Sequence, residues 1–540
     1  MGVASQMRVL IGAARPGPRA VRVALACVVV LCAAAVASPP VSEASSVPTP
    51  RPRVLRVGSW RGRSGEFTSI QDAVGAARPG DWILVGPGAY HEQADRSGVE
   101  GDEAGAGVSI TTPDVHMRGM DRNRVVVDGT KPGSPTCDAA ATSQDSGPDR
   151  SDGQARGRNG IEVLEVDGVT VENLTVCNFL AGVGGGNEVW FNGGDGSGTT
   201  NMGGFRGAYL SATSTFYGGS DGPMAQYGVF ASNVHGPGRF DHTYAANMAD
   251  ASYYVGACPD CNTIVSDAHA QNSALGYSGT NSGGHLTLEH SEWDGNKAGI
   301  VTNSQNNDDA PSPQDGACPT ARSRSCTLFR DNFVHDNNNP NVPQSGTAAL
   351  GPVGTGVVIA GGRNDQVRNN RVANNGAWGI LVVPFPDTDT PPPIAHCEGG
   401  TASPGLCFFD AWGNEVAGNE LDHNGSFANE TNGDLADLSA RHDPGNCWHT
   451  NRTRRGQVTT APERLQQTNA RCGIPSAGAD LSSPLSQQVI CNTEVGGPCA
   501  DQPGHHYPRT KVVQMIPLAR QRAMPDPCAG VPANPWCAKP

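Results

Sequence analysis

Four residues whose side chains can bind metals or transfer protons occupy equivalent positions in the middle of the sequence. His242, Asp267, His290 and Asp331 each stand two places after a large apolar residue. If those apolar residues belong to adjacent parallel strands, the four side chains stack about 4.8 Å apart on one outer face. Alternating imidazoles and carboxylates could hold a divalent transition metal or act as acid and base. The alternative is a solvated ladder in which each imidazole is hydrogen-bonded by a neighbouring carboxylate.

Two further groups of residues could contact a substrate. Trp190 and Phe191 precede a glycine-rich stretch and could stack on a sugar ring or pack in the core. Arg368 and Arg371 could neutralise a substrate carboxylate, and an ion pair with Glu420 is the alternative. The sequence contains no Ser/His/Asp elbow, phosphate-binding loop or dinucleotide fingerprint.

A repeat of about 23 residues must position these side chains. Comparable strands open at Gly276, Gly299, Gly356 and Gly379, and two of the intervals are 23 residues. A second strand motif has apolar residues five places apart with polar residues between them, and it begins at Val171, Phe240, Val265, Leu288, Phe329, Val367 and Val416. Neither propeller blades nor leucine-rich repeats have this spacing, so the sequence predicts a solenoid of short stacked strands.

Asparagines recur at the ends of these strands. One follows each motif start by seven or eight places, namely Asn178, Asn247, Asn272, Asn296, Asn337, Asn374 with Asn375, and Asn424. Asn332, Asn370 and Asn419 form a similar set at an earlier bend. Asparagine tolerates left-handed φ, and stacked amides can hydrogen-bond in a ladder. We therefore predict tight bends closed by asparagine ladders.

A short amphipathic helix is predicted before the first coils. Ser69 can cap it, and Ile70, Ala73, Val74 and Ala77 form one apolar stripe. Because a solenoid exposes its hydrophobic interior at each end, we expect this helix to be an N-terminal cap.

The segments Ile70–Val74, Pro79–Asp81 and Val85–Tyr90, followed by these coils, resemble secreted right-handed parallel β-helix repeat proteins, whose fold is that of pectate lyases. The resemblance covers about residues 54–450. It implies an all-β protein, a right-handed parallel β-helix solenoid. That group includes lyases, hydrolases, epimerases and proteins of unknown role, so the resemblance specifies no reaction.

The resemblance also suggests a catalytic lysine. Calcium-dependent lyases of this fold use a lysine to remove the proton next to a uronate carboxylate, and Lys297 is the only lysine among the coils. The acidic calcium-binding cluster expected with it is absent from Ala274–Gly279. Asp308 and Asp309 could bind calcium or be merely solvated. Ca²⁺ and a divalent transition metal both remain candidate cofactors.

In this fold the cleft usually follows the first strand of each coil. Alternation places the following residues outward: Phe230, Ser232, Val255, Ala257, Ser278, Thr280, Val301, Asn303, Val358, Ala360, Leu381 and Val383. None of them is charged, and Glu162, which could contact a ligand, is the only acid predicted nearby. A glycosidase needs two carboxylates and a lyase needs a base with charge neutralisation, so this face lacks both sets. We expect an insertion or the Cys/Pro-rich region at the C-terminus to cover the apolar part of this face.

The first 37 residues have the pattern of a signal peptide. A basic leader precedes the apolar run Val23–Val36, and Ala35-Val36-Ala37 suits cleavage near Ala37. The run is shorter than the roughly twenty residues that span a bilayer, so we predict secretion and no membrane span. Cleavage removes four arginines and no acid, which changes the net charge from −14 to −18. Such a charge disfavours nucleic acid as a partner.

Fourteen of the 16 cysteines follow the leader, an even number that predicts disulfides in an exported protein. The expected pairs are Cys137/Cys177, Cys258/Cys261, Cys318/Cys326, Cys397/Cys407, Cys447/Cys472, Cys491/Cys499 and Cys528/Cys537. The predicted organisation is a signal peptide at 1–37, a Pro/Ser-rich linker at 38–53, the β-helix at 54–430 and a Cys/Pro-rich C-terminal cap at 431–540.

Two functions fit these observations. In the first, the exported solenoid binds a polysaccharide at the cell surface or outside the cell without cleaving it. In the second, it is a polysaccharide lyase or related carbohydrate-active enzyme whose site is built from insertion loops, with a calcium requirement. The uncharged first-strand face favours the first, and the sequence leaves open whether the protein is an enzyme.

Overall fold

The computed structural model describes residues 51–94, 104–150, 152–194, 198–219, 222–307, 327–397, 399–402, 405–454, 456–493, 506–508 and 510–537. Beyond Arg51 these residues belong to one compact unit, Pro52–Pro540. The predicted signal peptide, most of the predicted linker, Asp308, Asp309, the pair Cys318/Cys326 and Cys499 of the pair Cys491/Cys499 lie outside the described residues. Within the described ranges, no helix is both long enough and apolar enough to cross a membrane.

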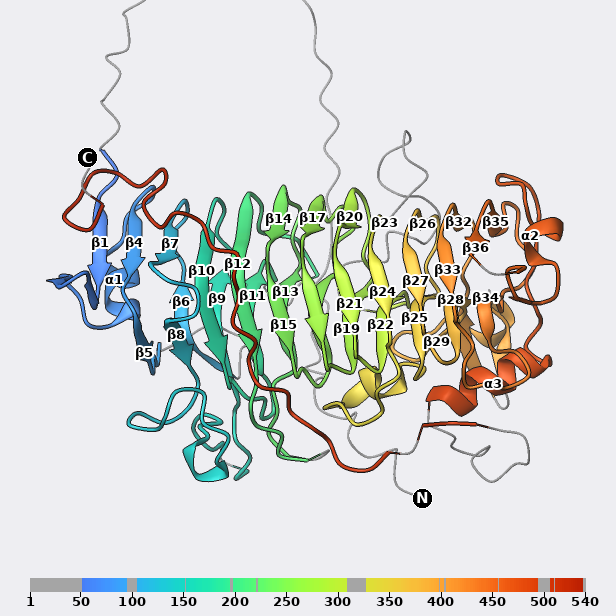
Figure 1. Ribbon diagram of the computed structural model, residues 1–540, viewed down its shortest axis with the longest axis horizontal. Helices are drawn as coiled ribbons and strands as arrows, with labels where there is room; N and C mark the ends of the chain where they lie inside the picture. Colours follow the sequence, from blue (N-terminus) through green and yellow to red (C-terminus); the bar gives the residue numbers. More distant parts are fainter. Residues whose placement is uncertain are drawn as a thin grey trace, which may run out of the picture. The chain divides into compact units, whose positions relative to one another are not determined.

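Each coil contributes one strand to each of three parallel series (Figure 1). In one coil these strands are β19 (Leu275–Thr280), β20 (Leu286–Glu289) and β21 (Glu292–Asp294), and β22 (Ala298–Asn303) begins the next coil. Equivalent strands of successive coils pair in parallel, with Tyr277 opposite Ile300 and Leu288 opposite Phe329. The chain is therefore a right-handed parallel β-helix, as predicted.

The first series is an eleven-stranded sheet. Besides β19 and β22 it contains β6 (Gly105–Ile110), β9 (Arg158–Leu164), β11 (Asn187–Asn192), β13 (Tyr227–Ser232), β16 (Ala251–Gly256), β25 (Thr355–Ala360), β28 (Trp378–Val383), β34 (Gly433–Asp437) and β37 (Thr460–Ala461).

The second and third series form one 21-stranded sheet because β10 and β12 are long enough to belong to both. With β20, the second series contains β1 (Val54–Val57), β4 (Trp82–Val85), β7 (His116–Gly119), β10 (Thr170–Cys177), β12 (Phe205–Thr213), β14 (Gly238–Asp241), β17 (Thr263–Ser266), β23 (Thr327–Arg330), β26 (Gln366–Arg368), β32 (Glu415–Ala417) and β35 (Cys447–His449). With β21, the third contains β5 (Gly88–Tyr90), β8 (Val125–Asp128), β15 (Tyr244–Ala246), β18 (His269–Gln271), β24 (Phe333–His335), β27 (Arg371–Ala373), β33 (Glu420–Asp422) and β36 (Arg452–Thr453).

The remaining elements lie at the ends and in the insertions of the β-helix. They are the short strands β2 (Ser59–Trp60), β3 (Arg63–Ser64), β29 (Phe385–Asp387), β30 (Thr401–Ala402) and β31 (Leu406–Phe409), the helices α1 (Ile70–Ala76), α2 (Leu465–Thr468) and α3 (Pro484–Thr493), and the 3-10 turns η1 (Ala141–Ser143), η2 (Gly346–Leu350) and η3 (Ile394–His396).

Aliphatic and aromatic side chains of successive coils stack in the interior. The seven residues that begin the predicted second-strand motif all lie fully buried in one inward row. The sequence pattern missed the coil of β12, where Gly207 occupies this row between Val171 and Phe240. Because glycine has no apolar side chain at the position where the motif begins, the sequence pattern cannot be detected in this coil.

The predicted N-terminal helix forms. Ser69 accepts a hydrogen bond from the Asp72 backbone N–H at 3.2 Å, and Ile70, Ala73 and Val74 are buried in the main core. Its role as a cap stays a prediction.

The predicted asparagines occupy two neighbouring positions in each bend, whereas the sequence suggested that they share one position. Residues such as Asn247, Asn272 and Asn374 have positive φ of 69°, 49° and 58°. The neighbouring position carries the amide ladder, in which Asn337 Nδ2 donates to Asn375 Oδ1 at 3.2 Å. The ladder predicted at the earlier bend is confirmed, since Asn332 donates to Asn370, and Asn370 to Asn419, at 3.0 Å each.

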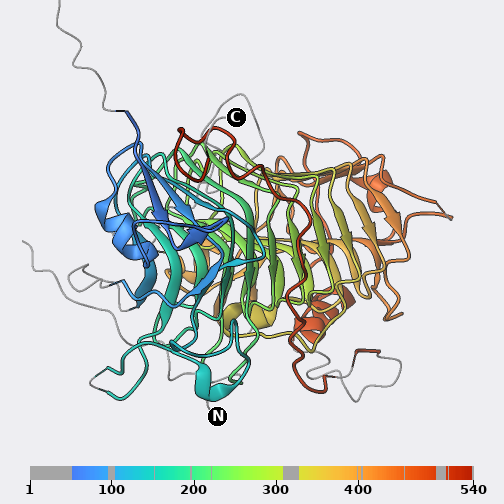
Figure 2. The ribbon, with the colours of Figure 1, turned by 60° about the vertical axis from the view of Figure 1, so that its left-hand side comes forward.

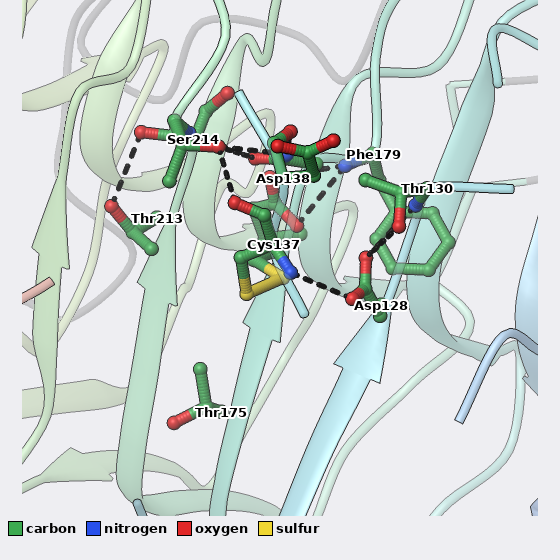
Figure 3. The surroundings of a disulfide bond; sticks show 12 residues. Asp128, Thr130, Cys137, Asp138, Thr175, Phe179, Thr213 and Ser214 are labelled. Carbon is green, nitrogen blue, oxygen red and sulfur yellow. Dashed lines mark hydrogen bonds between the residues drawn. A yellow bond between two sulfur atoms is a disulfide. The ribbon is translucent and has the colours of Figure 1, made fainter. Parts of the chain in front are cut away.

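Five of the predicted disulfides are present, Cys137–Cys177, Cys258–Cys261, Cys397–Cys407, Cys447–Cys472 and Cys528–Cys537. The first joins the insertion after β8 to the end of β10 (Figure 3). Buried Asp128 accepts hydrogen bonds from the backbone N–H groups of Thr130 and Cys137 beside it. The disulfide and this carboxylate together anchor the base of the insertion on the rigid coils.

The region predicted as a C-terminal cap has three parts. The predicted boundary at 430 is too early, because β34 to β37 continue the parallel pairing as far as Ala461. The helices α2 and α3 follow. Residues 506–537, which we call the tail, then return along the coils to the first strands (Figures 1 and 2). Trp536 Nε1 donates to the Arg63 carbonyl oxygen at 3.0 Å, so the tail reaches the opposite end from the last coil.

Candidate functional site

The outer face of the eleven-stranded sheet is divided into an aromatic half and an aliphatic half. One outward row runs through successive coils as Glu162, Trp190, Phe230, Tyr254, Ser278, Val301, Val358 and Leu381. From Trp190 to Leu381 this row contains no charged residue, which agrees with the predicted uncharged face.

The prediction was wrong at one strand, β16. Alternation predicts Val255 and Ala257 as outward residues of this strand, but Tyr253 is opposite Val229 and Tyr277 and is fully buried. Tyr254 therefore faces outward, whereas Val255 is buried in the main core.

Four aromatic side chains form what we call the aromatic patch: Trp190, Tyr227, Phe230 and Tyr254. The ring of Phe230 stacks on Trp190 at 5.2 Å and on Tyr227 at 4.6 Å, between ring centroids. Tyr254 meets Phe230 edge-on at 4.8 Å. Trp190, Tyr227 and Phe230 are partly exposed. The partly exposed rings therefore present flat apolar surfaces on the two adjacent coils of β11 and β13, and Tyr254 is buried beside them.

Polar side chains form a second outward row beside the patch. It contains Asn192, Ser232, Thr280 and Asn303. Trp190 Nε1 donates to Ser232 Oγ at 3.0 Å, and Thr280 Oγ1 donates to Asn303 Oδ1 at 3.0 Å. Such amides and hydroxyls next to aromatic rings can hydrogen-bond a polar ligand while its apolar face stacks on the rings.

Glu162 and Phe191 do not contact solvent as the predicted binding roles require. The Glu162 carboxylate is fully buried and accepts a hydrogen bond from Asn192 Nδ2 at 2.8 Å, so it orients that amide. Phe191 alternates inward, is fully buried and packs against Phe205 and Phe240 in the core. Its predicted sugar contact is wrong.

Asp250 is a titratable group at the edge of the patch that the sequence patterns did not identify. Its Oδ2 accepts a hydrogen bond from the Tyr227 hydroxyl at 2.9 Å. Burial raises the pKa of Asp250 to about 7, although this hydrogen bond opposes the rise. It precedes β16 in a bend, where neither a strand motif nor a metal-ligand spacing marked it.

The aliphatic half of the face is covered. Val301, Val358 and Leu381 are buried in a cluster with Leu485 of α3 and Ala348 of η2. The predicted cover by an insertion and the C-terminal region is confirmed.

Lys297 supports this cover and cannot be the predicted base. Its side chain is 1% exposed, and its ammonium donates to Gln344 Oε1 at 3.1 Å, to the Thr493 carbonyl at 3.3 Å and to the Ala349 carbonyl. Burial lowers the pKa of Lys297 to about 8. A catalytic base must reach the substrate, and this amine is enclosed by η2 and the end of α3.

The two predicted arginines lie on different strands. Arg368 of β26 forms an ion pair with Glu415, while the Arg371 guanidinium lies over the Phe333 ring at 4.4 Å. The alternative partner, Glu420, is opposite Arg371 in the sheet and pairs with Arg454. Neutralisation of a substrate by either arginine stays a prediction.

His242, Asp267, His290 and Asp331 occupy equivalent backbone positions on successive coils, at positive φ of 55°, 51°, 50° and 55°. His242 hydrogen-bonds the adjacent Asp241 at 3.2 Å and stacks on Tyr209. In the described part of the chain, the groups of potential ligand atoms within 4.8 Å of one another do not include this column. The backbone conformation accounts for these residue types, and metal binding by the column stays a prediction without geometric support.

No protein-family model and no curated protein matches this chain. Among solved structures, the A-module of mannuronan C-5 epimerase AlgE4 from Azotobacter vinelandii is similar at 14% identity and a TM-score of 0.42, covering 72% of this chain and 90% of that one. A mannuronic acid specific polysaccharide family 6 lyase from human gut microbiota is similar at 11% identity and a TM-score of 0.37, covering 81% and 93%. Pectate lyase Pel9A is similar at 11% identity and a TM-score of 0.33, covering 68% and 76%.

The strand order defines the class of the protein, a right-handed parallel β-helix. At these low identities and TM-scores, the similarities carry no argument about its reaction or substrate.

Proposed function

We propose that this protein binds an uncharged polysaccharide at the aromatic patch without cleaving it. The observation that carries the proposal is the stacking of Trp190, Tyr227 and Phe230 as partly exposed rings on adjacent coils. The C–H faces of sugar rings bind to flat aromatic surfaces, and the adjacent amides and hydroxyls suit sugar hydroxyls.

Charge favours a neutral chain. The two outward rows beside the patch contain no lysine or arginine between Trp190 and Asn303 among the residues described, and Asp250 lies at the edge. The protein as a whole carries a net charge of −14. A polyuronate would be repelled by such a surface unless a cation bridged the two.

The lack of a catalytic pair favours binding over cleavage. Glycoside hydrolysis uses two carboxyl groups across the bond. Among the described outward residues near the patch, Glu162 is fully buried, so only Asp250 offers a partly exposed carboxyl group. A lyase remains the second candidate because a carboxyl group with a pKa of about 7 could act as a base.

The test is affinity electrophoresis against neutral and uronate polysaccharides, with absorbance of unsaturated products followed in parallel. Wild-type protein should be retarded by at least one neutral polymer, and Trp190→Ala and Phe230→Ala should each weaken retardation about tenfold, or about 1.4 kcal/mol. Trp412→Ala is the matched control, because Trp412 is also partly exposed but follows β31. Retardation unaffected by the patch variants would contradict the proposal, and an unsaturated product would replace it with lyase activity.

A further inference from the structure

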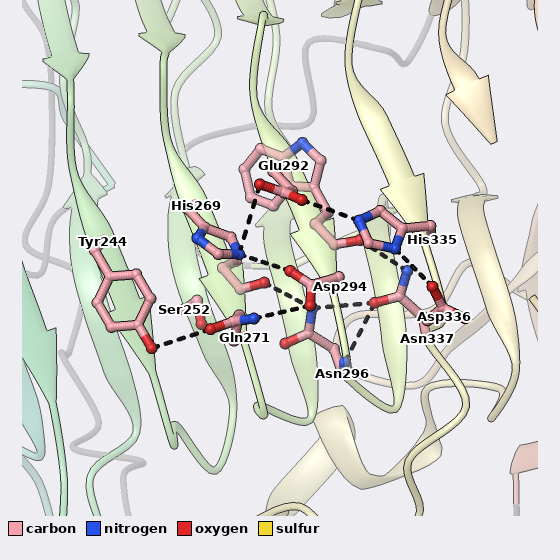
Figure 4. Close-up of polar contacts among 12 residues, drawn as sticks. Tyr244, Ser252, His269, Gln271, Glu292, Asp294, Asn296, His335, Asp336 and Asn337 are labelled. Atoms are coloured by element: carbon pink, nitrogen blue, oxygen red, sulfur yellow. Dashed lines mark hydrogen bonds and ion pairs between the residues drawn. The ribbon is translucent and has the colours of Figure 1, made fainter. Parts of the chain in front are cut away.

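A second cluster of functional side chains lies on the outer face of the third strand series, away from the eleven-stranded sheet. His269, Glu292, Asp294 and His335 come from the adjacent strands β18, β21 and β24 (Figure 4). His269 is opposite Glu292, and Asp294 is opposite His335. Two imidazoles and two carboxylates therefore form a cluster across three adjacent coils.

The ligand atoms of His269, Glu292 and Asp294 all lie within 4.8 Å of one another, and His335 contacts this group through Glu292. His269 Nε2 is 2.6 Å from Asp294 Oδ1 and 4.0 Å from Glu292 Oε2, and His335 Nε2 is 3.1 Å from Glu292 Oε1. Tetrahedral ligands at zinc distances of 2.0–2.2 Å lie roughly 3.3–3.6 Å apart. Small side-chain rotations bring His269, Glu292 and Asp294 into that range, whereas His335 must also turn toward His269 and Asp294 to join them.

Outer hydrogen bonds hold the inner side chains in place. His335 Nδ1 lies 2.7 Å from Asp336 Oδ2, a contact that directs Nε2 toward Glu292. Gln271 donates to Asp294 Oδ2 at 2.8 Å, and the Tyr244 hydroxyl donates to Gln271. Carboxylates and amides that orient ligands in this way are typical of metal centres.

The composition of the cluster also suits a metal. Two other groups of close ligand atoms occur in the described ranges, but both contain disulfide cysteines. Imidazole with carboxylate suits zinc, copper or nickel, whereas calcium takes oxygen ligands.

We propose that His269, Glu292, Asp294 and His335 bind one divalent transition-metal ion, with Zn²⁺ as the best match. The strands fix the ligand backbones before the ion arrives, and the partial exposure of all four side chains leaves it a path from solvent. This site is independent of the aromatic patch, because its residues belong to a different strand series.

The test uses the full chain without an affinity tag, stripped with EDTA and titrated with Zn²⁺ alone by calorimetry. We expect saturable binding of one ion and a rise in Tm on adding Zn²⁺. His269→Ala and His335→Ala should each weaken binding at least tenfold. Co²⁺ in place of Zn²⁺ should give the visible spectrum of a tetrahedral site in wild-type protein only.

The matched control is His423→Asn. His423 is an exposed imidazole beside Asp422 at positive φ, and asparagine tolerates that conformation. It should leave Zn²⁺ affinity unchanged. Glu292→Gln, at a side chain that is 47% exposed, is the second ligand variant if a histidine variant fails to fold. No saturable Zn²⁺ binding, or equal affinity in the ligand variants and wild type, would overturn the proposal and leave a network of ion pairs.

Discussion

Asn370 illustrates how one side chain closes a bend in this fold. Its Nδ2 donates to the Phe329 carbonyl and to Asn419 Oδ1, and its Oδ1 accepts from the backbone and side chain of Asn332. The residue is 1% exposed, so water cannot replace these partners. The amide therefore satisfies buried groups of three consecutive coils.

We expect Asn370→Ala to lower the free energy of unfolding by about 2–3 kcal/mol, because it leaves buried donors and acceptors without partners. Asp331→Gly is the comparison. Asp331 is exposed at a φ of 55°, which glycine adopts freely, so its loss should change stability by less than about 0.5 kcal/mol. Urea unfolding followed by tryptophan fluorescence measures both. Equal losses would show that the ladder has no special role.

Asn370 and Asp331 also show when a repeated residue type can be explained from the sequence alone and when it cannot. Asn332, Asn370 and Asn419 recur at equivalent places, and a stacked amide explains that repetition directly. His242 and Asp267 recur just as regularly, but His and Asp are both favoured at positive φ and as metal ligands. Only backbone angles and side-chain directions distinguish these explanations. The cluster at His269 gave no such signal, because its ligands come from two different rows on three strands.

The strands were predictable as elements because their apolar residues recur every coil. At β16 the period failed, since Tyr253 and Tyr254 are equally large and either could face inward. Packing decides between them. The ring centroids of Tyr253 and Trp293 lie 5.5 Å apart inside the coils. The Tyr253 hydroxyl donates a hydrogen bond to Thr243 Oγ1 at 3.0 Å, so this buried polar group has a partner. The sequence gives no local cue for that partner, which lies in the bend between β14 and β15.

The helix α3 acts as a cover for the aliphatic half of the outer face. Leu485 on this helix is 2% exposed and packs in the cluster with Val358 and Leu381, whereas Ile490 is 53% exposed. The two residues therefore give a matched pair of aliphatic truncations within one element.

Leu485→Ala should destabilise the docked helix by about 2–5 kcal/mol, as for other buried leucines, and should increase amide hydrogen exchange in α3. Ile490→Ala should change neither property appreciably. Hydrogen exchange monitored by mass spectrometry checks both variants. Unchanged protection in Leu485→Ala would mean that Lys297 and the loop contacts hold the helix without this side chain.

At the scale of the whole molecule, the tail adds contacts between the C-terminal residues and coils that lie far away in the sequence. Asn272 donates to the Gln514 carbonyl at 2.7 Å, Asn123 to the Gln521 carbonyl at 2.9 Å, and Arg118 to the Ala529 carbonyl at 2.6 Å. Trp536 is buried against Leu84 and Met120 of the first coils. Repetition could not predict this path, because the tail has no period and its partners are side chains at bends.

Removal of residues 506–540 should expose Leu84 and Met120 and leave the buried guanidinium of Arg122 without its Ala523 partner. We expect a lower Tm and faster proteolysis in the first coils, because those coils lose buried apolar area. Limited proteolysis with mass mapping checks the location. Trp536→Ala should reproduce part of the effect, and an unchanged first-coil digestion pattern would contradict it.

A stack of repeats normally folds by adding neighbours, and each end can open without disturbing the other. Arg118 and Ala529 are 411 residues apart in the chain yet share a hydrogen bond, so the first coils obtain their final surface only after the last residues have been made. Long-range closure of this kind slows folding and requires a late docking step. Until Trp536 docks, the apolar side chains of Leu84 and Met120 are exposed on the early coils, where they can cause aggregation.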